Sequence, residues 1–314
     1  MVRFLTKRIF IAIVQLFVVA SLVFLFLRLM PGDPVKLALG SEKAADPEIV
    51  AAMEKQLGLD QPLLKQYTTY MSDLAHFHLG TSITDRSSVM ENIMLRLPRT
   101  IEIALVSIII ASIVGIIMGL IAALKWRTFT DFFMTAMAAL GISLPVFVMG
   151  TLLIVIFSLT LNWFPASGYI DFVKDPIKHI QRLILPSLAL ALGLAASITR
   201  MTRSSMLEVE SKEFVQTLRA KGLPERMVIF KHSFRNAIIP IITIIGLQLG
   251  SLIGGTVLVE YLFNWPGIST LLVKAVSYRD YPTVQGCILV ISVFFITVNT
   301  LVDILYGLLD PRVR

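Results

Sequence analysis

The sequence predicts an all-α integral membrane protein with six transmembrane helices, and two observations support this. First, 56% of the 314 residues are hydrophobic and the mean hydropathy is +0.79, which is too apolar for a soluble protein of this size. Second, six apolar runs reach about 18 residues or more, the length at which a helix spans a bilayer. The runs cover, approximately, residues 9–29, 100–124, 133–160, 184–201, 237–259 and 284–308.

The first run follows Lys7 and Arg8, as the apolar core of a signal peptide would. It is longer than such a core, and no convincing small-x-small cleavage site follows it. We therefore expect residues 1–30 to form an N-terminal segment with an uncleaved first transmembrane helix.

Residues 31–99 are expected to form a long extracytoplasmic loop with short helices. Asp46 and Pro47 suit the cap and first turn of a helix that Gly58 would end. A second helix is expected from about Pro62 to Ala75, because its apolar residues recur with helical spacing.

Residues 100–314 are expected to form the core, with the other five spans. Pro145 predicts a kink or break near Ser143-Leu144-Pro145 in the third span. The fourth span is expected to begin at Leu185-Pro186-Ser187, because proline suits a first turn.

Charge predicts the orientation. If both termini are cytoplasmic, the cytoplasmic segments carry 15 basic and 6 acidic residues, whereas the loop at 31–99 carries 7 basic and 9 acidic ones. The positive-inside rule favours this arrangement. It also explains the net charge of +7 without nucleic acid, for which the sequence shows no aromatic and basic platform.

The cytoplasmic segment 207–235 is basic and polar, although two apolar runs flank it. We expect a helix over Leu207–Ala220, a turn at Gly222 and a second short helix that begins near Pro224. A short helix on the membrane surface can insert into a groove on a partner. The alternative is an ordinary solvated basic loop.

Short motifs along almost the whole chain resemble one transporter family. Arg219-Ala220-Lys221-Gly222, followed by His232, Arg235-Asn236-Ala237 and Pro240, resembles the coupling loop of binding-protein-dependent ABC importer permeases. The closest resemblance is to the dipeptide/oligopeptide/nickel family, and to the first of its two paralogous permease subunits. Further matching pieces are Pro31-Gly32-Asp33-Pro34, Leu79-Gly80-Thr81-Ser82, Pro165-Ala166-Ser167-Gly168, Trp265-Pro266-Gly267, Arg279-Asp280-Tyr281-Pro282 and Asp310-Pro311-Arg312.

The resemblance implies a type I ABC importer permease of the bacterial cytoplasmic membrane. Its partners would be a paralogous permease, two cytoplasmic ATPase subunits that bind ATP and Mg, and an extracytoplasmic substrate-binding protein. The chain itself would be non-catalytic and bind no cofactor, and it lacks the GxxxxGK[ST] phosphate loop. Peptides are the expected substrate, with nickel, metal chelates, glutathione or haem as alternatives.

The resemblance and the intramembrane polar residues give three groups of candidate site residues. The ATPase-coupling group is Thr217, Arg219, Ala220, Lys221, Gly222, Leu223, Pro224, Glu225, His232, Arg235 and Asn236. Candidates for the translocation pathway are Ser143, Pro145, Ser187, Thr243, Gln248, Ser251, Glu260 and Asn299. Trp265, Arg279 and Asp280 are candidates for an outer gate or binding-protein contact, although Trp265 is alternatively an interfacial anchor and the other two alternatively hold loops together. One departure from the family pattern, Leu218 in place of the commoner alanine, leaves the fine packing of the loop open.

Glycines four residues apart predict close helix packing. Gly115 and Gly119 form one pair, and Gly246, Gly250 and Gly254 form a second series. The second series either packs internally or faces the partner permease.

Two other classes of function fit less well. An intramembrane protease would need a nucleophile and base, but no histidine lies inside an apolar run. An ion-coupled secondary transporter would need intramembrane carboxylates, for which Glu260 and Asp303 are available, but it would leave the basic loop unexplained. The single cysteine, Cys287, and the scattered histidines predict no metal site.

Overall fold

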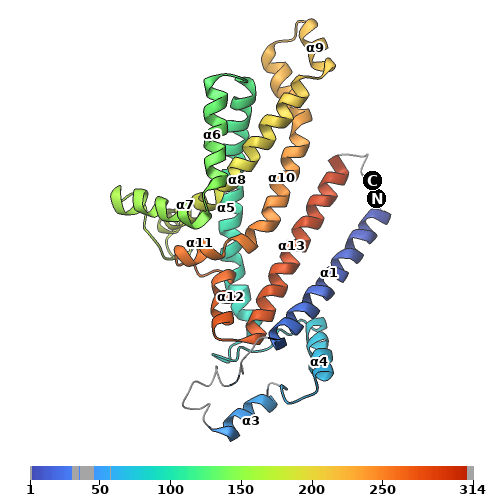
Figure 1. The fold of residues 1–314 in the computed structure, drawn as a ribbon, viewed down its shortest axis with the longest axis vertical. Coiled ribbons are helices and arrows are strands. Elements are labelled where there is room, and N and C mark those ends of the chain that lie inside the picture. Colours follow the sequence, from blue (N-terminus) through green and yellow to red (C-terminus); the bar gives the residue numbers. More distant parts are fainter. Residues whose placement is uncertain (1, 30–34, 36–45, 57, 310–314) are drawn as a thin grey trace. The chain divides into compact units, whose positions relative to one another are not determined.

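The computed structural model describes residues 2–29, 35, 46–56 and 58–309, and these residues form helices, turns and one isolated bridge between Thr81 and Ser88 (Figure 1). Within these described residues, five helices are long and apolar enough to cross a membrane, and the bent pair α6 and α7 makes six if it is counted as one span. The chain is a multi-pass membrane protein, as the sequence predicts. The helices are α1 (Val2–Leu29), α3 (Pro47–Gln56), α4 (Leu63–Ala75), α5 (Val89–Leu124), α6 (Phe129–Ser143), α7 (Val146–Leu153), α8 (Pro176–Glu210), α9 (Glu213–Ala220), α10 (Phe234–Gly255), α11 (Val257–Leu262), α12 (Ile268–Ser277) and α13 (Tyr281–Leu309).

The chain divides into two compact units. One contains Ile101–Trp265 and the segment that begins at Val298, and we call it the core unit. The other contains Val2–Thr100 and Pro266–Thr297, and we call it the N-terminal unit. Residues 266–297 therefore belong to the same unit as the first helix and the long loop, although they are far from them in the sequence.

The break predicted in the third span is confirmed. Helix α6 ends at Ser143, Leu144 is extended, and α7 begins at Val146 after Pro145, with an angle of 106° between the two helical segments. Proline disfavours the helical conformation of the residue before it, and Leu144 is extended here, so the helix stops at this point. Residues Ile154–Thr160 continue α7 as a π-helix.

The predicted start of the fourth span is wrong. Helix α8 begins at Pro176, ten residues before Pro186, and Asp175 caps it by accepting a hydrogen bond from the Lys178 amide at 3.1 Å. Pro186 therefore lies inside a helix of 35 residues. Such a helix is about 52 Å long, more than the hydrocarbon core requires, so it extends beyond the membrane.

In the core unit, α8 packs against α6, α7 and α10. Its crossing with α5 needs glycine: a Cβ at Gly115 would lie 2.7 Å from Ile198 Cβ, and one at Gly119 would lie 2.5 Å from Thr202 Cβ. The predicted close packing of this pair is confirmed.

The second glycine series packs internally at two of its three members. A Cβ at Gly246 would meet Val302, and one at Gly250 would lie 2.7 Å from Asn299 Oδ1. A Cβ at Gly254 would meet nothing within 4 Å, so this glycine has no packing role among the described residues.

The N-terminal unit contains both predicted loop helices. The Glu48 amide donates to Asp46 Oδ1 at 2.9 Å, and Gly58 ends α3 with a φ of +66°. Helix α4 packs on α1, where the Phe24 ring stacks on Tyr70 and meets Tyr67 edge-on. A buried cluster of Val89, Ile93, Ile268, Leu271 and Cys287 joins α5 to α12 and α13.

Candidate functional site

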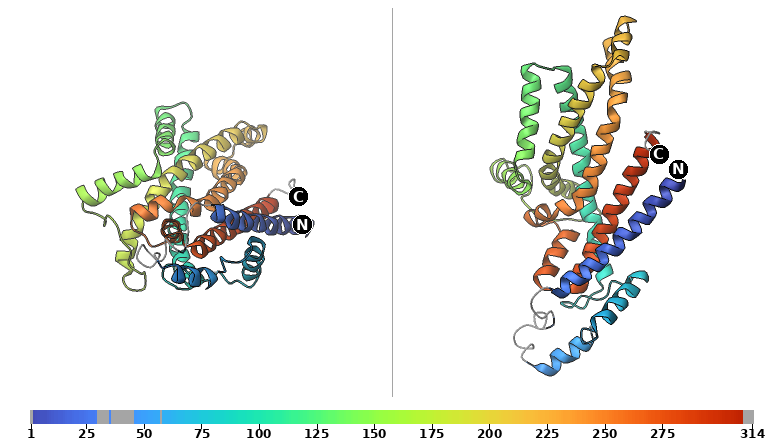
Figure 2. Two further views of the ribbon diagram at one scale, coloured as in Figure 1. Left: turned by 60° about the horizontal axis from the view of Figure 1, so that its bottom comes forward. Right: turned by 45° about the vertical axis from the view of Figure 1, so that its right-hand side comes forward.

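The segment from the end of α8 to the start of α10, residues 207–235, forms a helical hairpin, which we call the coupling hairpin after the role that its sequence predicts. Figures 1 and 2 show α8 and α10 side by side, with α9 beyond their ends. The expected single helix over Leu207–Ala220 is wrong, because α8 ends at Glu210 and α9 begins at Glu213. The second helix is also longer than expected, since a π-helical segment, Met227–Ser233, leads directly into α10.

The coupling hairpin is anchored by an apolar base. Val215 of α9 and Val228 of the π-helical segment are fully buried, in a cluster with Met206 and Val209 of α8. Ala123 and Ala237 complete the buried set, and Leu218 and Leu223 pack against it. Leu218, the residue that departs from the family pattern, therefore has a place in this cluster.

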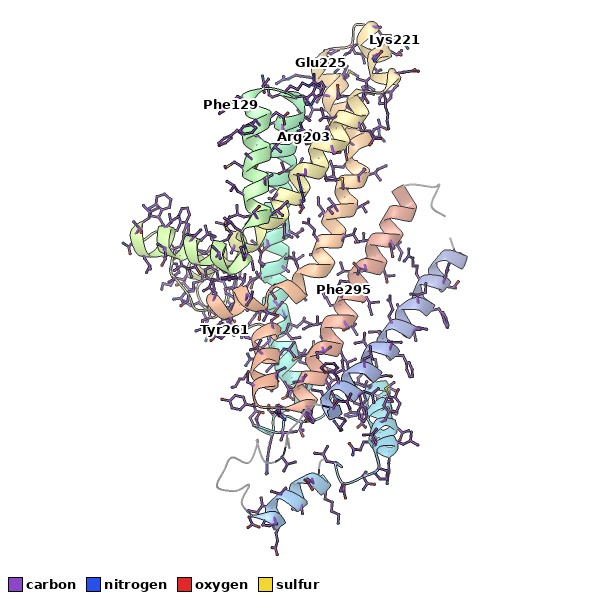
Figure 3. All side chains as sticks on the ribbon, in the orientation of Figure 1. Phe129, Arg203, Lys221, Glu225, Tyr261 and Phe295 are labelled. Carbon is purple, nitrogen blue, oxygen red and sulfur yellow. The ribbon has the colours of Figure 1, made fainter. Side chains whose placement is uncertain are left out.

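Most of the predicted coupling residues lie on the exposed side of the hairpin. Figure 3 shows Lys221 and Glu225 at its tip. Gly222 has a φ of +73°, a left-handed conformation that favours glycine, and a Cβ there would meet nothing within 4 Å. The exposed members are Thr217, Arg219, Ala220, Lys221, Gly222, Pro224, Glu225, Arg235 and Asn236, whereas Leu223 and His232 are half-buried.

Arg219 connects three parts of the hairpin. Its guanidinium donates to Glu225 (Nη2 to Oε1, 2.7 Å; Nε to Oε2, 3.2 Å) and also to Glu210 at the end of α8. The hydrogen bonds from Arg219 lower the pKa of Glu225, and the two carboxylates raise the pKa of Arg219. The exposed tip is thus held by ion pairs as well as by its apolar base.

The start of α10 adds a second polar contact. The side-chain amide of Asn236 donates to the carbonyl oxygen of His232 at 2.7 Å, one helical turn earlier. His232 Nε2 is buried and has no hydrogen-bond partner among the described residues.

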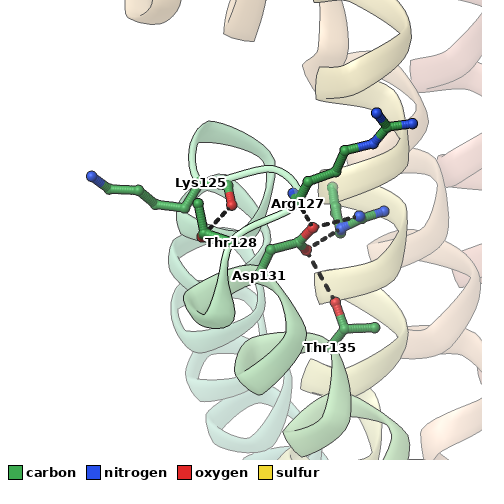
Figure 4. Close-up of polar contacts among 6 residues, drawn as sticks. Lys125, Arg127, Thr128, Asp131 and Thr135 are labelled. Atoms are coloured by element: carbon green, nitrogen blue, oxygen red, sulfur yellow. Dashed lines mark hydrogen bonds and ion pairs between the residues drawn. The ribbon is translucent and has the colours of Figure 1, made fainter.

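An ion pair that the sequence does not predict joins α6 to α8. Asp131 accepts from Arg203 Nε at 2.6 Å and Nη2 at 2.8 Å, from the Arg127 amide at 3.0 Å and from Thr135 Oγ1 at 3.3 Å (Figure 4). The Asp131 side chain is 8% exposed. The only signal in the sequence was an acidic residue at the start of an otherwise apolar helix.

The candidate pathway residues have different environments in the core unit. Ser143 and Pro145 are exposed at the break between α6 and α7, whereas Ser187 is buried. Thr243 lines a groove of about 440 Å³ between α8 and α10. Gln248 is half-buried, and the side chain of Ser251 lies outside the described part of the structure.

Two pathway candidates have buried polar atoms. Glu260 is fully buried, and its Oε1 accepts from Thr256 Oγ1 at 3.1 Å. Asn299 packs against Gly250, and its Oδ1 is buried without a hydrogen-bond partner among the described residues. These contacts fit helix ties as well as pathway positions.

Trp265 is fully buried in the core unit. Its ring meets Tyr169 and His179 edge-on at centroid distances of 4.8 and 5.7 Å. His179 is itself 1% exposed, and its ring nitrogens lie 2.6 Å from Glu102 Oε1 and 2.6 Å from the Ile170 carbonyl oxygen. A contact of the Trp265 side chain with another protein is therefore not available in this conformation, and the residue supports the loop from within.

Asp280 holds two segments of the N-terminal unit together. It is 2% exposed, and it accepts from Ser82 Oγ (2.5 Å), the Ile83 amide (3.1 Å) and Thr84 Oγ1 (3.1 Å). It also accepts from Thr283 Oγ1 at 2.8 Å at the start of α13. The neighbouring Arg279 is half-buried, with a φ of +53°.

No group of three or more histidine, cysteine, aspartate or glutamate side chains is arranged to hold a metal ion in the described part of the chain.

Comparisons with known proteins identify the family. Residues 115–314 match the family described as binding-protein-dependent transport system inner membrane component, and residues 1–104 match the N-terminal segment of such membrane components. The chain is 41% identical to the di/tripeptide transport system permease protein DppB of Pseudomonas aeruginosa, over all of this chain and 99% of the relative. It is also 41% identical to the glutathione transport system permease protein GsiC of Escherichia coli, with the same coverage.

Two solved structures share the fold. One is an amino acid ABC transporter, with a TM-score of 0.53 and 14% identity over 69% of this chain and 94% of that chain. The other is the MetNI methionine ABC transporter in an inward-facing conformation, with a TM-score of 0.57 and 15% identity over 70% and 97%. From the full-length relatives and the family match, the chain belongs to the binding-protein-dependent transport system inner membrane components, the permease subunits of ABC importers.

Proposed function

We propose that this chain is the first permease subunit of an ATP-driven peptide importer of the bacterial cytoplasmic membrane. The supporting observation is the coupling hairpin, a polar exposed tip on a buried apolar base between two membrane helices. The names of the full-length relatives favour short peptides as substrate.

The hairpin is the proposed contact with one of two ATPase subunits. Because its base packs on α5, α8 and α10, a displacement of α9 moves these helices with it. The chain therefore converts movement of the ATPases into opening and closing of a route, while ATP and Mg remain on the partners. Both termini lie in the cytoplasm in this arrangement.

The remaining partners follow from the same proposal. A paralogous permease provides the other half of the route, and an extracytoplasmic binding protein delivers the peptide. Ser143, Pro145, Ser187, Thr243, Gln248, Ser251, Glu260 and Asn299 are the proposed pathway positions. Trp265, Arg279 and Asp280 are the proposed residues of the outer gate.

The proposal is tested by transport in proteoliposomes that contain the complete assembly and its binding protein. We expect ATP-dependent uptake of a labelled dipeptide, with unlabelled glutathione and nickel compared as competitors. Uptake that persists without ATP and follows an imposed ion gradient would refute it.

A substitution at Gly222 tests the coupling role. A Trp there would be strained at a φ of +73° and adds bulk at the exposed tip, so Gly222→Trp should insert normally but lose uptake while ATP hydrolysis remains. Gly254→Ala is the matched control, because a Cβ at Gly254 meets nothing within 4 Å. Uptake at the wild-type rate in Gly222→Trp would contradict the coupling role.

A further inference from the structure

A cavity of about 350 Å³ lies within the N-terminal unit. Its lining includes no residue of the coupling hairpin and no pathway candidate. Arg28 from the last turn of α1, Gln66 and Tyr70 from α4, and Gln285 from α13 line it. None of these residues has a role in the proposed function.

Three of the lining residues carry a buried polar atom that lacks a hydrogen-bond partner among the described residues. The atoms are Arg28 Nη1, the Tyr70 hydroxyl oxygen and Gln285 Nε2. Buried polar groups are nearly always paired, so these three atoms around one cavity need a partner that the described residues do not supply. All three atoms can donate a hydrogen bond, and one belongs to a permanent cation.

The Arg28 guanidinium is held in place by its other contacts. Its Nε donates to Gln66 Oε1 at 2.9 Å, and its central carbon lies 4.8 Å from the Phe24 ring centroid and 5.6 Å from that of Tyr281. The amide nitrogen of Gln66 donates in turn to the carbonyl oxygens of Leu59 (3.1 Å) and Gln61 (2.8 Å), which fixes the amide orientation. The guanidinium is therefore ordered before any ligand arrives.

Tyr70 supplies a neutral donor. Its ring stacks on Phe24 at 5.5 Å, and burial raises the pKa of its hydroxyl, so the proton stays on the oxygen at neutral pH. Lys65 and the carboxylate of Asp73 also line the cavity and carry opposite charges, so the fixed Arg28 guanidinium and the neutral donors favour a ligand with several acceptor oxygens and a negative charge.

We propose that this cavity binds an oxyanion, namely the phosphate of a phospholipid headgroup or a free anion such as inorganic phosphate. Position favours the lipid: Arg28 lies at the end of the membrane span Thr6–Leu29, where headgroups lie. Leu25, Phe26 and Leu29 are exposed on the same helix turns and suit contact with acyl chains.

The test uses the transporter complex purified in detergent and depleted of lipid. Native mass spectrometry measures the binding of phosphatidylglycerol and of diacylglycerol, which lacks the phosphate, and calorimetry measures the binding of inorganic phosphate. Tyr70→Phe removes one donor and should weaken phosphatidylglycerol binding about tenfold, since a hydrogen bond to a charged group is lost. Arg28→Gln should weaken it more.

Tyr67→Phe is the matched control on the same helix. The Tyr67 hydroxyl lies 2.7 Å from Ser21 Oγ, and Tyr67 does not line the cavity, so this variant should bind phosphatidylglycerol as the wild type does.

The outcomes distinguish a phospholipid headgroup from a free anion, and either of these from the absence of an oxyanion site. Phosphatidylglycerol binding that exceeds diacylglycerol binding and falls in Tyr70→Phe supports the headgroup. Inorganic phosphate binding with the same dependence on Tyr70, without a preference for the phospholipid, supports a free anion. Equal binding of the two lipids without phosphate binding, or wild-type affinities in both Tyr70→Phe and Arg28→Gln, would overturn the proposal.

Discussion

Arg219 and Glu225 form an ion pair across the turn that contains Gly222, with 2.7 Å between Nη2 and Oε1. The same guanidinium pairs with Glu210 at the end of α8, so α9 is joined to the helical segments before and after it. The pair lies at the exposed tip, where the side chains are 40% and 56% exposed. At that exposure it adds little to stability, and its expected effect is on how the hairpin transmits movement.

Loss of this pair is expected to loosen coupling without unfolding the protein. In Glu225→Gln, we expect a change in the free energy of unfolding below about 1 kcal/mol and more ATP hydrolysed for each peptide imported. The measurement is the ratio of ATP hydrolysis to uptake in proteoliposomes. Glu208→Gln is the control, because it breaks a separate exposed pair with Lys212 at the end of α8. Equal ratios in the two variants would argue against a transmitting role.

The same pair predicts a dependence on pH. Hydrogen bonds from Arg219 lower the pKa of Glu225, so the contribution of the pair is complete above the unfolded carboxyl pKa and is lost as pH falls through the folded value. Amide hydrogen exchange of residues 213–226, corrected for intrinsic rates, should stay constant from about pH 8 to pH 5 and rise below about pH 4.5. Glu225→Gln should remove this acid-dependent rise, and a transition near neutral pH would indicate another group.

The fold could be predicted where local chemistry decides it. Pro145 broke the third span as expected, and Asp46 with Gly58 bounded a helix in the loop. The prediction failed at Pro186, because Asp175 and Pro176 provide a better helix start ten residues earlier and tertiary packing maintains the helix through the later proline. An apolar span alone does not show how far its helix extends into water.

The site could be predicted as a segment but not as a set of contacts. A polar segment between apolar runs predicted two helices with a turn at Gly222, and the structure has that turn, with a φ of +73°. The coupling role of these residues stays a prediction. The contacts of Arg219 with Glu210 and Glu225 depend on how the chain folds back at Ser211 and Gly222, which the spacing does not reveal. Asp131 and Arg203 are 72 residues apart, so only the packing of α6 on α8 brings them together.

The crossing of α5 and α8 should tolerate no side chain at Gly119. A Cβ there would lie 2.5 Å from Thr202 Cβ and 2.7 Å from the Thr199 carbonyl oxygen, so the helices must separate. We expect Gly119→Ala to lower the free energy of unfolding by about 1–3 kcal/mol, as overpacking does. Thermal unfolding in detergent measures this. Gly193→Ala on α8 is the control, since its Cβ would meet its nearest neighbour at an ordinary 3.6 Å, and equal loss in both variants would contradict the explanation.

Asp280 should be replaceable by asparagine but not by alanine. Asparagine keeps an acceptor for the buried Ile83 amide, and its NH₂ can donate to the hydroxyl groups of Ser82 and Thr283. Alanine leaves the amide donor unpaired, with an expected loss of about 3 kcal/mol, against about 1 kcal/mol for asparagine. Limited proteolysis of the 79–88 segment, together with thermal unfolding, measures both. Similar losses in the two variants would show that the carboxylate charge, and not the acceptor, holds the segment.

Removing only the cation of the Asp131–Arg203 pair should destabilise the protein far more than removing both charges. In Arg203→Met the Asp131 carboxylate, 8% exposed, loses its cation, and we expect a loss of about 3–5 kcal/mol. Adding Asp131→Asn removes the buried charge and should recover more than half of that loss. Thermal unfolding of both single variants and the double variant measures the coupling free energy. Lys125→Met, which removes an exposed cation from the turn between α5 and α6, is the control and should change little. Additive losses in the double variant would mean that the two side chains stabilise the helices independently.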